Sequence, residues 1–149
     1  MVMKKGQAAL DFLMTYGWAI ALVVIVAAAL FALGVFDVSN FVGTKAAGFS
    51  GVAVQGWQMS GTTLAVKLTN QVGQKINITG VSATIGTSTV ANMTVMELST
   101  GETSGAIGIT GLPSQTSGAG YQAKMTINYT DLNSGFLAST TGTLTGKAV

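Results

Sequence analysis

The spacing of hydrophobic and polar residues changes once along this chain, near residue 44. Before that point, residues 12–36 carry no charge and are apolar except for Thr15 and the glycines Gly17 and Gly34. An α-helix rises about 1.5 Å per residue, so about 20 residues cross the hydrocarbon core of a bilayer, which is roughly 30 Å thick. The run therefore predicts a helix that is inserted in a membrane at some stage.

After residue 44 the chain is rich in Thr, Ser and Gly, and apolar residues recur at every second position, as in half-buried strands. The apolar positions with this spacing are Leu64, Val66, Leu68, Ile76, Ile78, Val81, Ala83, Ile85, Tyr121, Ala123, Met125, Ile127 and Tyr129. Breaks that contain glycine separate the runs, at 60–62, 70–74, 86–88, 99–105, 117–120 and 133–135. About six to eight short antiparallel strands with such spacing are typical of a β-sandwich of the immunoglobulin-like type.

Together these patterns predict an α+β chain, with a hydrophobic helix over residues 7–43 and a β-sandwich head over 44–149. Further strands are predicted near 52–58, 90–98 and 136–145. The apolar phase changes from odd to even positions within 90–98, which predicts a β-bulge there. We expect the aromatic residues of this part, Trp57, Tyr121 and Tyr129, to pack in the core rather than bind a ligand.

Charge and composition exclude several function classes. Only 8% of the 149 residues are charged, against roughly 25% in soluble globular proteins. The net charge of +2 equals the contribution of Lys4 and Lys5 alone, so the rest of the chain is neutral and nucleic-acid binding is not expected. The chain has no His and no Cys, which removes disulfides, the usual metal ligands and the usual general base. Glu97 and Glu102 are the closest carboxylates, and we expect neither an enzyme nor a bound cofactor.

The lysines that flank the apolar run predict its orientation. Lys4 and Lys5 precede the run and no lysine follows it until Lys45, which places the N-terminus in the cytoplasm and exports the rest of the chain. A secretory signal would be cleaved near Ala27-Ala28-Ala29, but its apolar region is usually only about 7 to 15 residues long. A plain membrane anchor fits the length and the charges and accounts for Asp11 taken alone, but it does not explain the placement of Gly6 and Gln7 relative to Asp11.

The residues before the run form a more specific pattern. Gly6 follows two lysines, Gln7 comes next, and Asp11 is the fifth residue after Gly6. This order resembles the N-terminus of archaeal type IV pilin precursors, which carry a class III signal peptide. Ala9 stands where serine is frequent in that family, and Asp11 stands where glutamate is usual. The resemblance is carried by the segment KKGQAALDFLMTYGWAI, residues 4–20.

The resemblance implies how the chain would be processed and used. A prepilin peptidase would cut between Gly6 and Gln7, remove residues 1–6 as a leader, and leave the helix attached. Lys4 and Lys5 would set the topology for that cut, and Asp11 would register an incoming subunit by pairing with the free amine of a neighbour's Gln7. The family also implies an assembly ATPase and a membrane platform as partners, and a helical surface filament that serves adhesion.

Two other functions stay open at this point. Archaellins, which are the subunits of a related motility filament, are the nearest competitor among filament proteins. A membrane-tethered β-domain that binds a ligand without polymerising is the alternative from another class.

The β part carries three sequons for asparagine-linked glycans, at Asn77, Asn92 and Asn128, each on the polar phase of its predicted strand. The charged residues after Gly43 are few for a solvated surface, and we expect either contacts with other subunits or glycans to cover much of it. These charged residues are Lys45, Lys67, Lys75, Glu97, Glu102, Lys124, Asp131 and Lys147.

Overall fold

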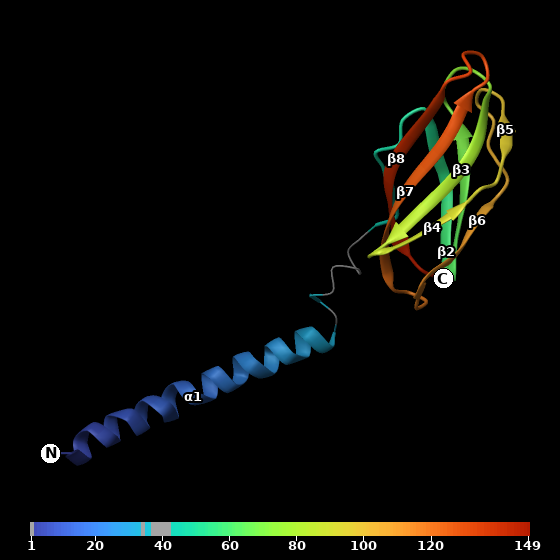
Figure 1. Cartoon of the computed structure of the whole chain (residues 1–149). Coiled ribbons are helices and arrows are strands. Elements are labelled where there is room, and N and C mark those ends of the chain that lie inside the picture. Colours follow the sequence, from blue (N-terminus) through green and yellow to red (C-terminus); the bar gives the residue numbers. More distant parts are fainter. Residues whose placement is uncertain (1, 34, 37–42) are drawn as a thin grey trace. The chain divides into compact units, whose positions relative to one another are not determined.

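The computed structural model describes residues 2–33, 35–36 and 43–149, and the chain divides into two compact units after residue 41. The first unit contains helix α1 (Val2–Ala32), and the second contains the β domain, by which we mean residues 43–149 (Figure 1). The prediction of a long apolar helix followed by a mostly antiparallel β-sheet domain is confirmed.

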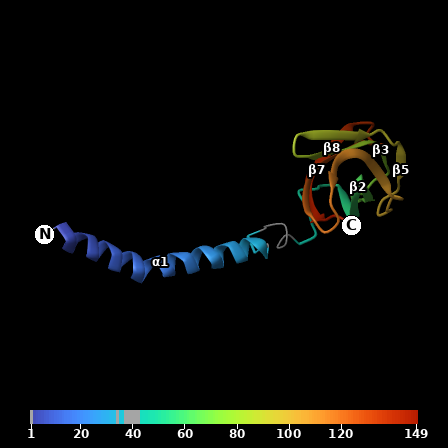
Figure 2. The same ribbon diagram turned by 90° about the horizontal axis from the view of Figure 1, so that it is seen from below.

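Helix α1 begins before the predicted cut and ends before the predicted limit of residue 43. The N–H group of Leu33 donates to the carbonyl of Ala29 at 2.9 Å, and that of Val35 donates to Leu30 at 3.1 Å. Within α1, residues 4–32 are long and apolar enough to cross a membrane, and their most apolar window of 18 residues has a mean hydropathy of 2.3. Figure 2 shows α1 as one uninterrupted helix. Residues 37–42 of the predicted helix lie outside the described residues.

The β domain contains two antiparallel sheets (Figures 1 and 2). In the first sheet the strand order is β1-β8-β7-β3-β4, and β5 also pairs with β3. In the second sheet β2 pairs with β6. The bounds are β1 (Lys45–Ala47), β2 (Val52–Asn70), β3 (Ile76–Ile85), β4 (Ser88–Asn92), β5 (Met96–Leu98), β6 (Ile107–Gln115), β7 (Gly120–Asp131) and β8 (Leu137–Lys147).

Strand β2 folds back on itself. A straight strand of its 19 residues would separate its ends by about 60 Å, since a strand rises about 3.3 Å per residue. The flanking residues nevertheless meet, because the N–H group of Gln71 donates to the carbonyl of Gly51 at 2.7 Å. Gly61 has a φ of 57°, a left-handed conformation that glycine adopts without steric cost. The break predicted at 60–62 is therefore a turn within β2.

Strand β7 confirms the predicted alternation: its odd-numbered residues from Tyr121 to Tyr129 are buried, and Gln122, Lys124 and Asn128 are exposed. The two sheets share one hydrophobic core, to which both contribute fully buried side chains. The largest of them are Met59, Leu64, Leu68, Ile76, Ile78, Ile109, Met125, Ile127 and Leu144. Tyr121 and Tyr129 belong to this core and Trp57 packs against it, as predicted.

The bulge predicted within residues 90–98 is wrong. That segment is not one strand: β4 ends at Asn92, β5 begins at Met96, and both pair with β3. Met93 and Val95 lie between the two strands and are 78% and 66% exposed. The change of apolar phase therefore reflects a gap between two short strands.

The register shift of the first sheet lies in β3, between Ile78 and Gly80, in its pairing with β7. The buried residues change there from even to odd positions, because Ile78 and Val81 both face the core. Gly80 pairs with Asn128 of β7 at this point and is buried, with the Met93 side chain lying over it.

We expect Met125→Ala to lower the free energy of unfolding by about 2 to 5 kcal/mol, because it leaves a cavity in the shared core. Urea unfolding in mild detergent, followed by the near-ultraviolet circular dichroism of the buried tyrosines, measures this change. Lys124→Ala on the exposed face of the same strand is the control and should shift the free energy by less than about 0.5 kcal/mol. Equal effects of the two substitutions would contradict the assigned core.

Candidate processing and assembly site

The residues singled out near the N-terminus all lie on α1. Lys4, Lys5, Gly6, Gln7 and Asp11 are helical and exposed. The Gly6–Gln7 peptide bond is therefore inside the helix, four residues after its first residue.

Packing within the chain does not require glycine at position 6. A Cβ atom added to Gly6 would meet no atom within 4 Å, apart from the helix's own nearby backbone. Glycine inside a helix is less favourable than alanine by about 1 kcal/mol. The fold alone would thus favour alanine at position 6, as it would at Gly17.

The first turns of α1 are weakly stabilised. No acidic residue lies in the first turn, while Lys4 and Lys5 place two positive charges near the positive end of the helix dipole. Gly6 adds its own cost in the next turn. A protease that binds its substrate in an extended conformation would have to unwind this segment, and its composition keeps the cost of unwinding low.

Asp11 lies four residues, or about one helical turn, after Gln7, so the two residues share a face of α1. The hydroxyl of Thr15 donates to the backbone carbonyl of Asp11 at 2.7 Å. Among the described residues, no hydrogen bond or ion pair is made to the Asp11 carboxylate. That carboxylate is therefore available to a cation from outside the described chain.

The rest of α1 presents apolar side chains in every direction, and none of its most apolar window is buried. The rings of Phe12 and Tyr16 contact each other with centroids 4.7 Å apart. They form part of a groove of about 390 Å³ that is lined only by apolar and aromatic side chains, namely Phe12, Tyr16, Ala19, Ile20, Val23 and Val24. A surface of this kind must be covered by lipid or by other helices.

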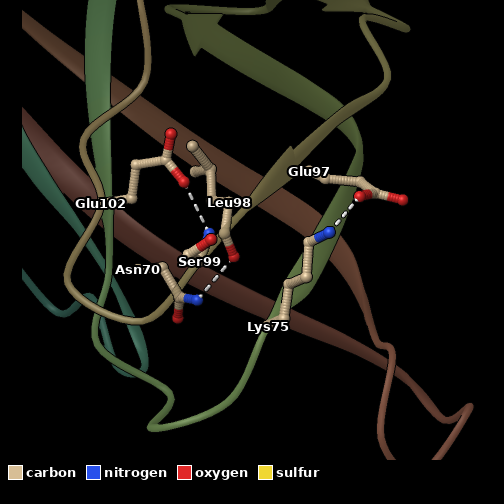
Figure 3. Close-up of polar contacts among 6 residues, drawn as sticks. All are labelled: Asn70, Lys75, Glu97, Leu98, Ser99 and Glu102. Carbon is tan, nitrogen blue, oxygen red and sulfur yellow. Dashed lines mark hydrogen bonds and ion pairs between the residues drawn. The ribbon is translucent and has the colours of Figure 1, made fainter.

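In the β domain, Glu97 and Glu102, the two carboxylates closest in the sequence, do not form an acid–base pair (Figure 3). Glu97 forms an ion pair with Lys75 at 2.5 Å, and Glu102 accepts a hydrogen bond from the N–H group of Ser99 at 2.8 Å. Over the part of the chain that the structure describes, no cluster of three His, Cys, Asp or Glu side chains could hold a metal ion.

Asn70 is a buried polar residue that sequence reasoning missed. Its amide nitrogen donates to the carbonyls of Gln74 at 2.7 Å and Leu98 at 3.0 Å, and its amide oxygen accepts from the N–H group of Val72 at 2.9 Å. Figure 3 shows its bond to Leu98. These bonds fix the turn between β2 and β3 and hold β5 beside it, so the role of Asn70 is structural.

The three sequons have different surroundings, although each lies on a strand. Asn128 on β7 is exposed, as predicted for the polar phase. Asn77 on β3 and Asn92 on β4 are only partly exposed, and Asn92 bonds to the strand β6. All three asparagines were predicted to be exposed from their place on the polar phase of a strand, and only Asn128 is exposed rather than partly exposed.

A comparison with protein-family models gives no match, and a comparison with curated protein sequences gives none either.

We expect Gly6→Ala to block removal of residues 1–6, because it adds a Cβ at the cut and stabilises the helix that must unwind there. The mass of the protein isolated from membranes of its source cells measures the processing. Gly17→Ala, where a Cβ also meets no atom within 4 Å, changes the helix equally and is the control. Full processing of Gly6→Ala would argue against a peptidase that reads this glycine.

We expect Asn70→Ala to lower the free energy of unfolding by about 2 to 4 kcal/mol, because it leaves buried carbonyl and N–H groups without partners. The urea titration described for Met125→Ala measures it. Gln71→Ala is the control, since the neighbouring Gln71 side chain is exposed. An effect no larger than that of Gln71→Ala would show that water replaces the lost bonds.

Proposed function

We propose that this chain is the structural subunit of an archaeal type IV pilus-like surface filament that polymerises through α1 and serves adhesion. Its precursor lies in the cytoplasmic membrane with the N-terminus inside, and is cut between Gly6 and Gln7. The mature subunit then joins a helical homopolymer outside the cell.

The exposed apolar surface of α1 is the observation that carries the proposal. Side chains on opposite faces of the helix, such as Leu22 and Phe31, are 51% and 69% exposed. Exposing several hundred Å² of such surface to water costs on the order of 10 kcal/mol, at about 25 cal/mol per Å². The helix is therefore covered in every stable state, first by lipid and then by sister helices.

Packing must favour the move from lipid into a bundle of helices, because both surroundings are apolar. Small residues, including Ala19, Ala21 and Ala28, alternate along α1 with large ones such as Leu22 and Leu30. Small residues let backbones approach closely, and large ones fill the gaps between neighbouring helices. A head-to-tail contact of this type, repeated without closing, produces a filament.

Asp11 gives the polymer a register. After the cut, the new N-terminal amine of Gln7 is a cation, and the Asp11 carboxylate is an anion in apolar surroundings. Unpaired charges are costly there, so pairing between the amine of one subunit and Asp11 of its neighbour favours one axial offset.

The remaining components follow from the same family resemblance. A prepilin peptidase, an assembly ATPase and a membrane platform would process and extrude the subunit. The β domain would be an immunoglobulin-like sandwich on the outside of the filament. Two antiparallel sheets that share one core support this arrangement.

A membrane-tethered binding module is the second candidate, since a single anchor also covers α1. The position of Gly6, which packing does not explain, favours the filament. Purification from the source cells distinguishes the two functions. Uniform filaments in electron micrographs, built of a subunit that begins at Gln7, would support the proposal. Detergent-dependent monomers that retain residues 1–6 would overturn it.

We expect Asp11→Ala to reduce the number of filaments per cell by about tenfold or more, because breaking a buried ion pair costs about 3 to 5 kcal/mol. Negative-stain electron microscopy counts the filaments, and the membrane fraction is checked for processed subunit. Asp11→Glu keeps the charge and should retain most filaments. A normal filament count for Asp11→Ala would remove the assigned role of Asp11 without affecting the processing step.

A further inference from the structure

We propose that Asn128 carries an asparagine-linked oligosaccharide and that the other two sequons, at Asn77 and Asn92, are unmodified. The inference requires only that the β domain is exported, which holds for both functions considered above. It goes beyond them because it assigns a modification site and the surface that the sugar covers.

The side of Asn128 that faces β8 is open. Asn128 lies in the middle of β7, opposite Gly80 of β3 and Ser139 of β8. Ser139 has a small, exposed side chain that does not crowd the exposed amide of Asn128, whereas Gly80 is buried under the Met93 side chain. Thr130, which completes the sequon, is partly exposed on the same strand.

A shallow depression of about 290 Å³ adjoins the Asn128 side chain. It is lined by Asn128, Leu137, Ala138 and Ser139. The volume lies at the lower end of the range for small-ligand sites, about 300 to 1,000 Å³, which suits a single sugar ring rather than a larger group. Leu137 is 78% exposed and supplies an apolar wall against which the less polar face of a ring can pack.

The amide of Asn92 is already used by the fold. Its nitrogen donates to the carbonyl of Gly108 in β6 at 2.6 Å, and its oxygen accepts a hydrogen bond from Thr94, the hydroxyl residue of the same sequon. Because β4 and β6 belong to different sheets, this bond ties the two sheets together. A sugar on that nitrogen would have to lie against the β6 backbone.

Asn77 is only partly exposed, and its amide oxygen is buried and has no hydrogen-bond partner among the described residues. Asn77 lies between Thr130 of β7 and Glu97 of β5, and Glu97 is held by its ion pair with Lys75. An oligosaccharide at Asn77 would have to displace these side chains, so a chain modified there folds less well than one modified at Asn128.

The surface around Asn128 also lacks the charge that usually keeps a protein surface hydrated. Of the outward-facing residues of β7, from Gln122 to Thr130, only Lys124 is charged. Leu137, Phe136 and Met93 are each more than 75% exposed, and the sulfur of Met93 lies 3.1 Å from where a Gly80 Cβ would be. A hydrated oligosaccharide at Asn128 covers part of this weakly charged surface.

The modification uses a polyprenyl-phosphate-linked oligosaccharide as the donor. A bond forms between the amide nitrogen of Asn128 and the anomeric carbon of the first sugar, and the bond from that carbon to the phosphate oxygen breaks. The phosphate leaves with the electron pair, and one amide hydrogen is released as a proton. The linked nitrogen keeps its second hydrogen.

Trypsin separates the proposed site from the other two, because the chain is cleaved only after lysine. Of the three sequon asparagines, the fragment 125–147 contains only Asn128, and the fragment 76–124 contains both Asn77 and Asn92. Mass spectrometry of the protein from its source cells should find a glycan mass on 125–147 and none on 76–124. An unmodified 125–147 fragment, or a glycan on 76–124, would overturn the assignment.

Matched variants test the sequon itself. Thr130→Ala should remove the glycan from 125–147, while Thr130→Ser, which keeps the hydroxyl, should retain it. Asn128→Gln should remove it as well. Near-ultraviolet circular dichroism identical to that of the unchanged protein shows that a variant is folded. Retention of the glycan in folded Thr130→Ala would show that the sugar is attached elsewhere in the fragment. Electron microscopy of the same samples reports on the filament separately.

Discussion

The apolar surface of α1 is the constraint on which the rest of the molecule depends. None of its most apolar window is buried among the described residues. Leaving such a surface in water is costly, so lipid or other apolar helices are its favoured surroundings. In the proposed function, membrane insertion, retention of the helix after processing and polymerisation would all meet this one requirement.

The β domain has a core of its own, whose buried residues all lie between Val52 and Ala148. Its stability comes from one core that both sheets share and from buried polar residues such as Asn70, whose amide bonds close the turn after β2. Few charges are available to hydrate its surface. Hydroxyl pairs on the outer faces supply part of the missing polarity, such as Thr126 with Thr141 at 3.0 Å and Thr84 with Thr89 at 2.8 Å.

Sequence patterns predicted the elements that have a regular spacing or a long run of apolar residues. The alternation from Tyr121 to Tyr129 predicted β7 and its core face, and the uncharged run predicted α1. The patterns failed where pairing decides the outcome. The segment 90–98 reads as one strand, but β3 pairs with it in two separate pieces. Asn70 and Asn92 resemble ordinary surface residues in the sequence, because each bonds to a backbone carbonyl far along the chain, of Leu98 and of Gly108, which no local pattern shows.

If the chain acts as proposed, its N-terminal segment must satisfy two conditions that conflict. As part of a polymer, residues from Gln7 onward would have to be helical, so that Asp11 lies one turn from the new N-terminus. As a substrate, the same stretch would have to open so that a protease reaches the Gly6 carbonyl. The position of the weakening residues would resolve the conflict, because Lys4, Lys5 and Gly6 destabilise the helix and all three precede the proposed cut. Cleavage would remove them together with the leader, so the mature helix would begin without them. The same cut would create the positive charge that a neighbour's Asp11 can pair with, and processing would then be a condition for assembly.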